Sequence, residues 1–176
     1  MTLLVEHYIL LLGLTIAVIT DLKYELIPNK LNGPLILAGF LVHAGKSQLM
    51  FSVAGFAIAF IVHFLLWQLR VERGGDAKLM IAVGALLGAA NVMEATAWYA
   101  AVYLVVAPVI LLMRGRLGNL WKVTKTLAQK GVGTKGEEEI ETTKLKTAPI
   151  IAVAVVIGYL TDYLYPAALD FFNTAG

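Results

Sequence analysis

Residues 49–69, LMFSVAGFAIAFIVHFLLWQL, contain no aspartate, glutamate, lysine or arginine. A helix of about 20 residues rises about 30 Å, which matches the hydrocarbon thickness of a bilayer. This segment therefore predicts a helix that crosses a membrane. The rest of the chain agrees, because 59% of the 176 residues are hydrophobic and only 15% are charged. We predict an all-α, polytopic membrane protein that forms a single domain over residues 1–176.

Five further apolar segments extend this prediction to a bundle of about six transmembrane helices. They lie at about residues 3–20, 33–45, 79–90, 95–113 and 148–169. Two of them, 33–45 and 79–90, are short enough that a re-entrant or interfacial segment is the alternative. The N-terminal segment lacks a basic region and a small-residue cleavage site, so we expect a retained membrane helix instead of a removed signal peptide.

The positions of lysine and arginine predict how these helices are oriented. Of the 14 lysine and arginine residues, all but Lys46 fall in the first, third and fifth loops between the segments. Short cytoplasmic loops of membrane proteins are enriched in positive residues. We therefore expect a protein of the cytoplasmic membrane, with both termini outside and the three basic loops on the cytoplasmic side.

The only long polar stretch, residues 114–147, is predicted to be a cytoplasmic loop with two parts. In RLGNLWKVTKTLAQK (116–130), apolar residues recur at three- and four-residue spacing. That spacing indicates an interfacial amphipathic helix at the headgroups, with a solvated connector helix as the alternative. The following GVGTKGEEEIETTKLK (131–146) combines glycines with an acidic run, which predicts a mobile stretch.

Composition argues against several classes of function. The chain has no cysteine, which excludes disulfides, thiolate catalysis and cysteine-ligated metal. His7, His43 and His63 lack the HxxH or HExxH spacing of metal ligands, so we interpret them as polar residues near an interface or packed inside the bundle. We expect no metal and no cofactor. A net charge of +2 without a zinc-finger or aromatic-basic array argues against binding to nucleic acid.

Asp21 and Asp76 stand apart because each lies where an apolar segment meets a predicted cytoplasmic loop. Asp21 ends the first segment in TDLKYELIPNK (20–30), where Pro28 terminates or bends the helix. Asp76 precedes the fourth segment in RVERGGDAKLM (70–80). Two carboxylates a few ångströms apart would share a proton, so one could act as general base for water and the other as general acid. Aspartates that cap helices or meet water are the alternative.

The other carboxylates give weaker signals. We interpret Glu25 and Glu72 as loop residues, and Glu6 and Glu94 as residues near the outer face. Asp162 lies inside the last apolar segment and would have a functional role only if it is buried.

The two aspartate regions resemble the signature sequences of the type IV prepilin peptidase family, membrane aspartic proteases of the GxGD type that include archaeal preflagellin peptidases. DLKYELIPNKL (21–31) is similar to the family's aspartate followed by a basic residue and an Ile-Pro-Asn turn. GGDAKLM (74–80) is similar to the family's Gly-x-Gly-Asp-x-Lys-Leu motif, and KTAPIIAVAVVIG (146–158) resembles its last helix. The three stretches occur in the family's order and extend the resemblance over nearly the whole chain.

The resemblance implies an endopeptidase that removes the basic leader from type IV prepilin-like or preflagellin-like precursors at the cytoplasmic face, in contact with membrane lipid. It makes Asp21 and Asp76 the catalytic pair. The supporting residues that it implies are Gly74, Gly75, Lys78, Lys23, Pro28 and Asn29. One position departs from the pattern, because Arg73 stands where the family motif has its first glycine. A non-enzymatic membrane scaffold or a small transporter subunit is the alternative function.

Longer bacterial members of this family add a cysteine-bearing cytoplasmic domain and can also N-methylate the processed pilin. The present chain has no cysteine and few residues before its first apolar segment. The resemblance is therefore greatest to the short members that serve tight-adherence pili or archaeal flagellin-like filaments. We expect peptidase activity, and the sequence gives no basis for predicting methyltransferase activity.

Overall fold

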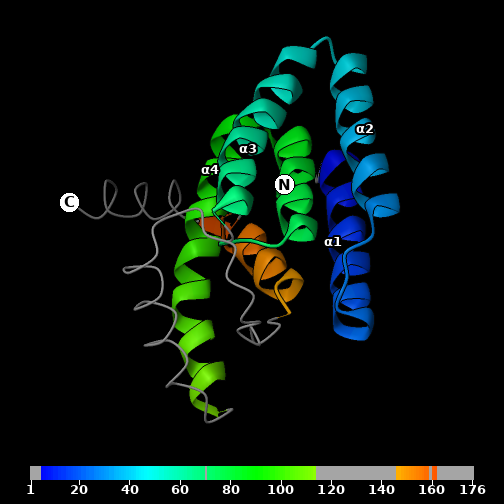
Figure 1. Cartoon of the computed structure of the whole chain (residues 1–176). Coiled ribbons are helices and arrows are strands. Elements are labelled where there is room, and N and C mark those ends of the chain that lie inside the picture. The colour runs from blue at the N-terminus through cyan, green and yellow to red at the C-terminus, as the bar shows by residue number, and fades with distance from the viewer. Residues whose placement is uncertain (1–4, 70, 114–145, 159, 162–176) are drawn as a thin grey trace, which may run out of the picture.

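Four long helices and one shorter helix account for most of the chain that the computed structural model describes, namely residues 5–69, 71–113, 146–158 and 160–161 (Figure 1). The helices are α1 (Val5–Tyr24), α2 (Asn29–Gly45), α3 (Leu49–Gln68), α4 (Gly74–Met113) and the last described helix (Ala148–Gly158). These residues contain no strand, so the predicted all-α class is confirmed for the described chain.

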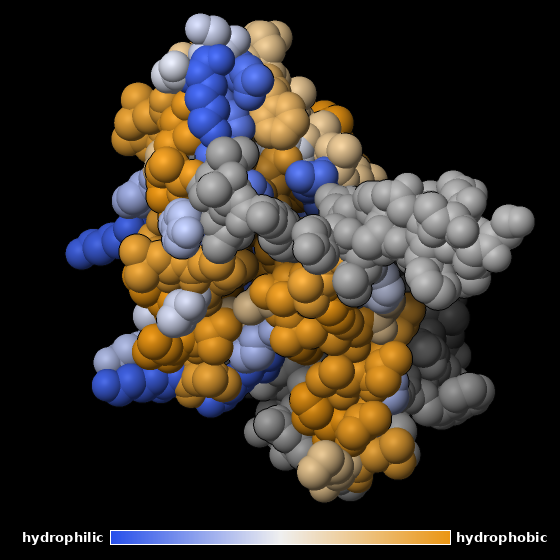
Figure 2. Space-filling model, turned by 180° about the vertical axis from the view of Figure 1, so that it is seen from behind, coloured by the Kyte–Doolittle hydropathy of each residue, from blue (hydrophilic) through white to orange (hydrophobic). Residues whose placement is uncertain are grey.

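Three helices of the described chain are long and apolar enough to cross a membrane: α1, α3 and residues Gly74–Ile110 of α4. Their outward faces carry large apolar side chains, such as Leu12, which is 64% exposed, and Ile61, which is 58% exposed. Figure 2 shows a face of the molecule on which apolar residues predominate and hydrophilic residues form separate patches. Apolar surface of this extent favours a lipid environment over water. The count of about six spans and their orientation stay predictions.

Two sequence predictions fall on parts of the chain that are not described. The interfacial helix predicted at 116–130 and the mobile stretch that follows it lie outside the described residues. Asp162 also lies outside them.

The connection between α1 and α2 follows from Pro28. Glu25 leaves the helix with φ 54°, and Pro28 holds an extended conformation (φ −74°, ψ 141°) directly before α2. The Pro28 carbonyl then accepts hydrogen bonds from the N–H groups of Leu31 and Asn32 at 2.9 and 3.4 Å. Ile27 is only 3% exposed, so its burial fixes the turn against the bundle. The predicted break at Pro28 is confirmed.

The chain reverses at Gly88, which has φ 81° and ψ 179° inside α4. The arm 74–87 runs antiparallel to α3, because Gly74 lies beside Trp67 and Gly84 beside Gly55. The arm 89–113 then returns toward the other end of α3 (Figure 1). There the Thr96 hydroxyl lies 3.1 Å from His63 Nε2. The sequence prediction placed this reversal about residues 91–94, which are helical. Gly88 determines the actual position because side-chain-bearing residues essentially never adopt its conformation.

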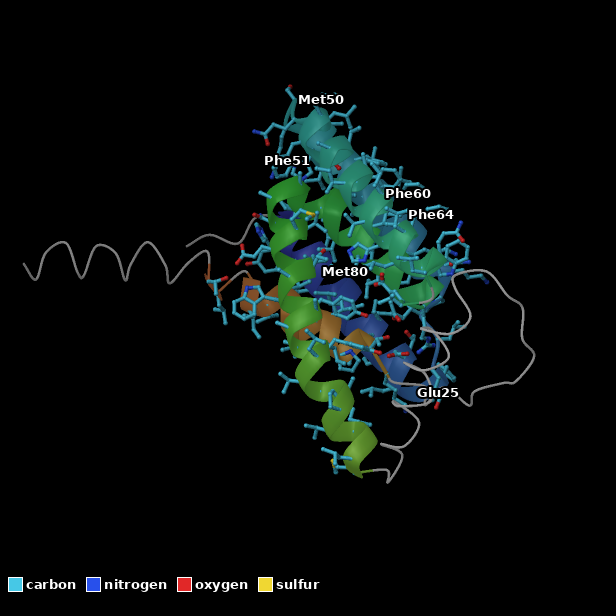
Figure 3. All side chains as sticks on the ribbon, turned by 60° about the vertical axis from the view of Figure 1, so that its left-hand side comes forward. Glu25, Met50, Phe51, Phe60, Phe64 and Met80 are labelled. Carbon is cyan, nitrogen blue, oxygen red and sulfur yellow. The ribbon has the colours of Figure 1, made fainter. Side chains whose placement is uncertain are left out.

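Polar side chains from α2 and α3 form hydrogen bonds with backbone carbonyl groups near this reversal. The Ser52 hydroxyl donates to the Ala85 carbonyl at 2.5 Å, and His43 Nε2 lies 3.0 Å from the Leu86 carbonyl oxygen. A helix that ends inside a bundle leaves carbonyl groups without intrahelical partners, and buried carbonyls need hydrogen bonds. These two side chains therefore stabilise the turn. Met50 and Phe51 mark this end of the molecule in Figure 3, and Glu25 lies at the opposite end.

Candidate functional site

Asp21 and Asp76 are both buried at the end of the bundle that carries Glu25. Asp21 lies in the last part of α1 and is 0% exposed, and Asp76 lies in the first turn of α4 and is 1% exposed. The two carboxyl groups are close enough to interact electrostatically. Fully buried aspartates are rare unless partners surround them. The structure therefore brings the two sequence-predicted aspartates together in one buried place.

The start of the last described helix lies against this pair. The Ala148 backbone N–H donates to Asp21 Oδ2 at 3.0 Å. The Thr147 hydroxyl interacts with the Asp76 carboxylate, although it completes no hydrogen bond of good geometry within the described residues. Residues separated from Asp21 by more than 120 positions thus complete its surroundings. The sequence signal for this contact was the resemblance of residues 146–158 to the family's last helix.

Arg73 connects the two motifs. Its Nη1 lies 3.5 Å from Asp21 Oδ1, and its Nη2 donates to the Glu25 carbonyl oxygen. The guanidinium also interacts electrostatically with Asp76. Its side chain is 38% exposed, whereas that of Asp21 is fully buried. The residue that departs from the family motif therefore lies directly beside the carboxylate pair.

The Ile-Pro-Asn turn packs against the first turn of α4, which contains Gly75 and Asp76. Asn32 Nδ2 donates to the Gly75 carbonyl at 3.4 Å, and Lys78 Nζ donates to Asn29 Oδ1 at 2.9 Å. A Cβ atom on Gly75 would lie 3.3 Å from the Cβ of Ile27, which is tighter than most real contacts. These contacts hold the beginning of α4 against the beginning of α2. They bring Asn29, Gly75 and Lys78, three of the sequence-predicted supporting residues, together near Asp76.

The remaining supporting residues have different positions. Pro28 precedes the first turn of α2, and Gly74 begins α4 beside the indole of Trp67. Lys23 is exposed, and its Nζ lies 5.1 Å from the ring centroid of Tyr24. Its contact is therefore a surface cation–π interaction, and the structure gives no contact between Lys23 and the buried pair.

Sequence reasoning missed a second buried polar group beside Asp76. Glu72, interpreted as a loop residue, is only 7% exposed, and its Oε2 lies 2.8 Å from Nδ1 of the fully buried His63. His63 Nε2 lies 3.1 Å from the Thr96 hydroxyl. Glu72 is also close enough to Asp76 to interact with it electrostatically. No spacing in the sequence links a histidine inside an apolar helix to a glutamate in the following loop.

The arrangement is suited to acid–base chemistry. Among the described residues, Asp21 Oδ1 and Asp76 Oδ2 each lack a hydrogen-bond partner. Asp21 differs in that its Oδ2 accepts the Ala148 N–H and its Oδ1 lies beside the Arg73 guanidinium. Two carboxyl groups with such different surroundings can take different protonation roles. In the described chain, no group of three or more histidine, aspartate or glutamate side chains is arranged to hold a metal ion.

Comparison with known proteins agrees with the motifs. Residues 8–118, more than half of the chain, match the type IV leader peptidase family, and this range includes both Asp21 and Asp76. The prepilin peptidase EppA of Methanothermobacter thermautotrophicus is 31% identical over 91 residues, which cover 48% of this chain and 24% of that relative. The match thus spans about a quarter of the relative's length. No solved structure matches the chain. The two motifs in sequence order, their convergence at one buried place and the match over residues 8–118 establish that the chain belongs to the type IV leader peptidase family.

Proposed function

We propose that this protein is an aspartic endopeptidase that removes the basic leader from prepilin-like or preflagellin-like precursors at the cytoplasmic face of the membrane. The observation that carries the proposal is the convergence of Asp21 and Asp76, one from each family motif, in a buried place at one end of the bundle. Membership of a peptidase family and the prepilin peptidase named among its relatives support the same activity.

Asp21 and Asp76 act on water as general base and general acid. The Ala148 N–H and the Arg73 guanidinium both face Asp21, so Asp21 is the partner better suited to hold the negative charge and remove a proton from water. Asp76 then protonates the oxygen of the scissile carbonyl as the water oxygen attacks its carbon. Asp21 then gives the proton it took from water to the leaving nitrogen, and Asp76 takes back a proton from one hydroxyl of the tetrahedral intermediate as the C–N bond breaks. These two transfers restore the shared proton of the pair.

The proposed precursor has a hydrophobic helix held in the bilayer, which would dock beside the exposed apolar faces of α1 or α3. Binding within the membrane restricts the precursor's motion and offsets part of the entropy cost of positioning the scissile bond. Glu25 and the buried carboxylates supply negative charge at this end of the molecule, which favours a basic leader.

Incubation of the purified protein in lipid with a pilin-like precursor tests this proposal directly. We expect time-dependent loss of the leader, detected by mass spectrometry at one defined bond. A precursor of identical hydrophobic helix but with its basic leader residues replaced by serine should be cut more slowly. An intact precursor after prolonged incubation with folded protein would favour a scaffold or transporter subunit instead.

Lys78→Ala should reduce leader cleavage by less than about tenfold. The change removes the hydrogen bond from Lys78 Nζ to Asn29 Oδ1, and an exposed hydrogen bond of this kind contributes about 1 kcal/mol at most to holding the two turns together. Initial cleavage rates of the wild type and variant measure the effect. Lys30→Ala is the matched control, because Lys30 is exposed near the beginning of α2, the helix that carries Asn29. Equal rates for both variants would limit Lys78 to a role in membrane orientation.

Arg73→Gln should lower the cleavage rate more than Lys78→Ala does, by about tenfold or more. It removes the positive charge 3.5 Å from Asp21 Oδ1 and the link to the Glu25 carbonyl, so both the charge and the position of Asp21 change. Arg73→Lys keeps the charge and should recover part of the rate. A rate for Arg73→Gln equal to that of the wild type would show that Asp21 does not depend on this guanidinium.

A further inference from the structure

His63, Glu72 and Thr96 form a buried polar chain that the proposed catalytic steps do not use. His63 comes from α3, Glu72 from the loop before α4, and Thr96 from the arm 89–113. The side chains of His63 and Glu72 are 0% and 1% exposed. Burial of two such groups costs free energy unless their hydrogen bonds are complete, so the positions of their protons can be worked out from the contacts.

The Thr96 hydroxyl fixes the tautomer of His63. This hydroxyl has a single proton, and its oxygen lies 2.7 Å from the Val92 carbonyl oxygen, which can only accept. That proton therefore points to Val92. His63 Nε2, 3.1 Å from the same hydroxyl oxygen, must then donate its own proton to Thr96.

The contact on the other side of the imidazole requires one more proton. Nδ1 of His63 and Oε2 of Glu72 are 2.8 Å apart, a distance typical of a hydrogen bond. With Nε2 already protonated, a neutral His63 has only a lone pair at Nδ1. A carboxylate of Glu72 has only lone pairs as well, so an unprotonated pair would be repulsive in a place without water.

We propose that His63 and Glu72 hold a proton between them and that this proton makes them a positioning pair for Asp76; the positioning role rests on the proposed function. Imidazolium with carboxylate and neutral imidazole with carboxylic acid contain the same number of protons, so the proton belongs to the pair. Glu72 Oε1 is buried without a hydrogen-bond partner among the described residues. Burying an oxygen without a hydrogen bond costs less free energy in a carboxylic acid than in a charged carboxylate. This difference favours neutral imidazole with a protonated Glu72.

The pair positions Asp76 by joining three elements behind it. Glu72 lies four residues before Asp76, and the Ala77 N–H donates to the Arg73 carbonyl at 3.0 Å, so the loop continues directly into the first turn of α4. His63 and Thr96 hold this loop against α3 and the returning arm. The other titratable or charged groups around the pair interact with Glu72 or with Asp76; they are Tyr99, Arg73, Asp21 and Tyr103. Loss of the shared proton therefore places an unpaired carboxylate beside the carboxyl pair of the site.

The sign of the pH effect follows from the proton count. A folded state that holds a proton which the unfolded chain releases loses stability as the pH rises. For one proton in a chain of this size, the melting temperature should fall by about 2–4 °C for each pH unit over which the folded pair holds a proton that the unfolded chain has released. Glu72→Gln replaces the shared proton with a permanent amide donor of the same length, so this fall should be much smaller.

The experiment compares melting temperatures between neutral and alkaline pH for four proteins in one detergent: wild type, Glu72→Gln, Asp76→Asn and Glu25→Gln. The decrease in melting temperature at alkaline pH should persist in Asp76→Asn, which shows that it does not come from the Asp21–Asp76 pair. It should also persist in Glu25→Gln, which removes an exposed carboxylate at the same end of the molecule. A fall in Glu72→Gln as steep as that of the wild type would overturn the shared proton. The melting temperatures test the shared proton whether or not a precursor is cleaved, so a failure of the proposed function can be distinguished from a failure of this proposal.

Two further measurements cover the tautomer and the role in positioning. The first is a set of ¹⁵N-histidine spectra of the wild type, in which the His63→Gln variant assigns the His63 signals. We expect His63 Nε2 to carry a proton. An unprotonated Nε2 with a protonated Nδ1 would overturn the proposed shared proton, and this measurement does not need a stable Glu72 variant. The ratio of wild-type to Glu72→Gln cleavage rates should fall as the pH rises, because titration of Asp21 and Asp76 affects both proteins. A constant ratio would contradict a positioning role.

Discussion

Asp21→Asn and Asp76→Asn should each reduce leader cleavage by at least about a hundredfold, to the background of the assay, while the protein remains folded and inserted. General acid and general base catalysis each contribute about 10²–10⁴ to a rate, and asparagine can perform neither role. The substitution changes side-chain volume little, and in Asp21→Asn the new amide oxygen could still accept the hydrogen bond from the Ala148 N–H. Initial rates of the purified variants in lipid measure the effect.

The double variant provides a sharper test of this pair. Residues that act as one unit lose most of their combined effect when either is removed, so Asp21→Asn with Asp76→Asn should be little slower than each single variant. Lys30→Ala is the control, because the exposed side chain of Lys30 lies near the beginning of α2 at the same end of the molecule. Appreciable cleavage by either single aspartate variant, with melting temperatures near that of the wild type, would show that these two carboxylates are not the catalytic pair.

Gly88→Ala should destabilise the protein by roughly 2–5 kcal/mol and lower its melting temperature by about 10 °C. Two independent costs add at this position. The backbone has φ 81° and ψ 179°, which strains every residue except glycine, and a Cβ atom would lie 2.2 Å from the end of the Phe51 ring. Thermal unfolding in detergent, followed by helical circular dichroism, measures the loss.

Gly33→Ala is the matched control for this change, because Gly33 is helical and a Cβ atom there would meet nothing within 4 Å. Alanine at that position should leave stability unchanged or increase it by up to about 1 kcal/mol. Phe51→Ala in the Gly88→Ala background separates the two costs, since it relieves the contact and leaves the backbone strain. Full recovery in the double variant would mean that the turn tolerates alanine, and no loss in Gly88→Ala itself would contradict the reversal at this residue.

The parts of the site that the sequence predicted are those with a local chemical cause. Pro28 cannot continue a helix, so the turn after α1 could be placed from its residue type alone. Asp21 and Asp76 differed from other carboxylates because each stands at the boundary of an apolar segment, and the family resemblance supplied the reason to pair them.

The parts that the sequence could not predict depend on packing between distant elements. Gly88 is one of several glycines in apolar surroundings, and the reversal was expected a few residues later because Asn91 and Glu94 are the polar residues there. His63 and Glu72 each had an ordinary interpretation when considered singly. Only the fold of α4 back along α3 shows that the Thr96 hydroxyl lies beside His63 Nε2.

The hydrogen bond from Ala148 to Asp21 also has a consequence for biosynthesis. A nascent chain carries both aspartates into the bilayer long before the ribosome has made residue 148. Until that residue arrives, Asp21 lacks the N–H group that donates to it, and the proposed site is incomplete. If the proposed activity is correct, it would begin only late in translation, after most of the chain has been made.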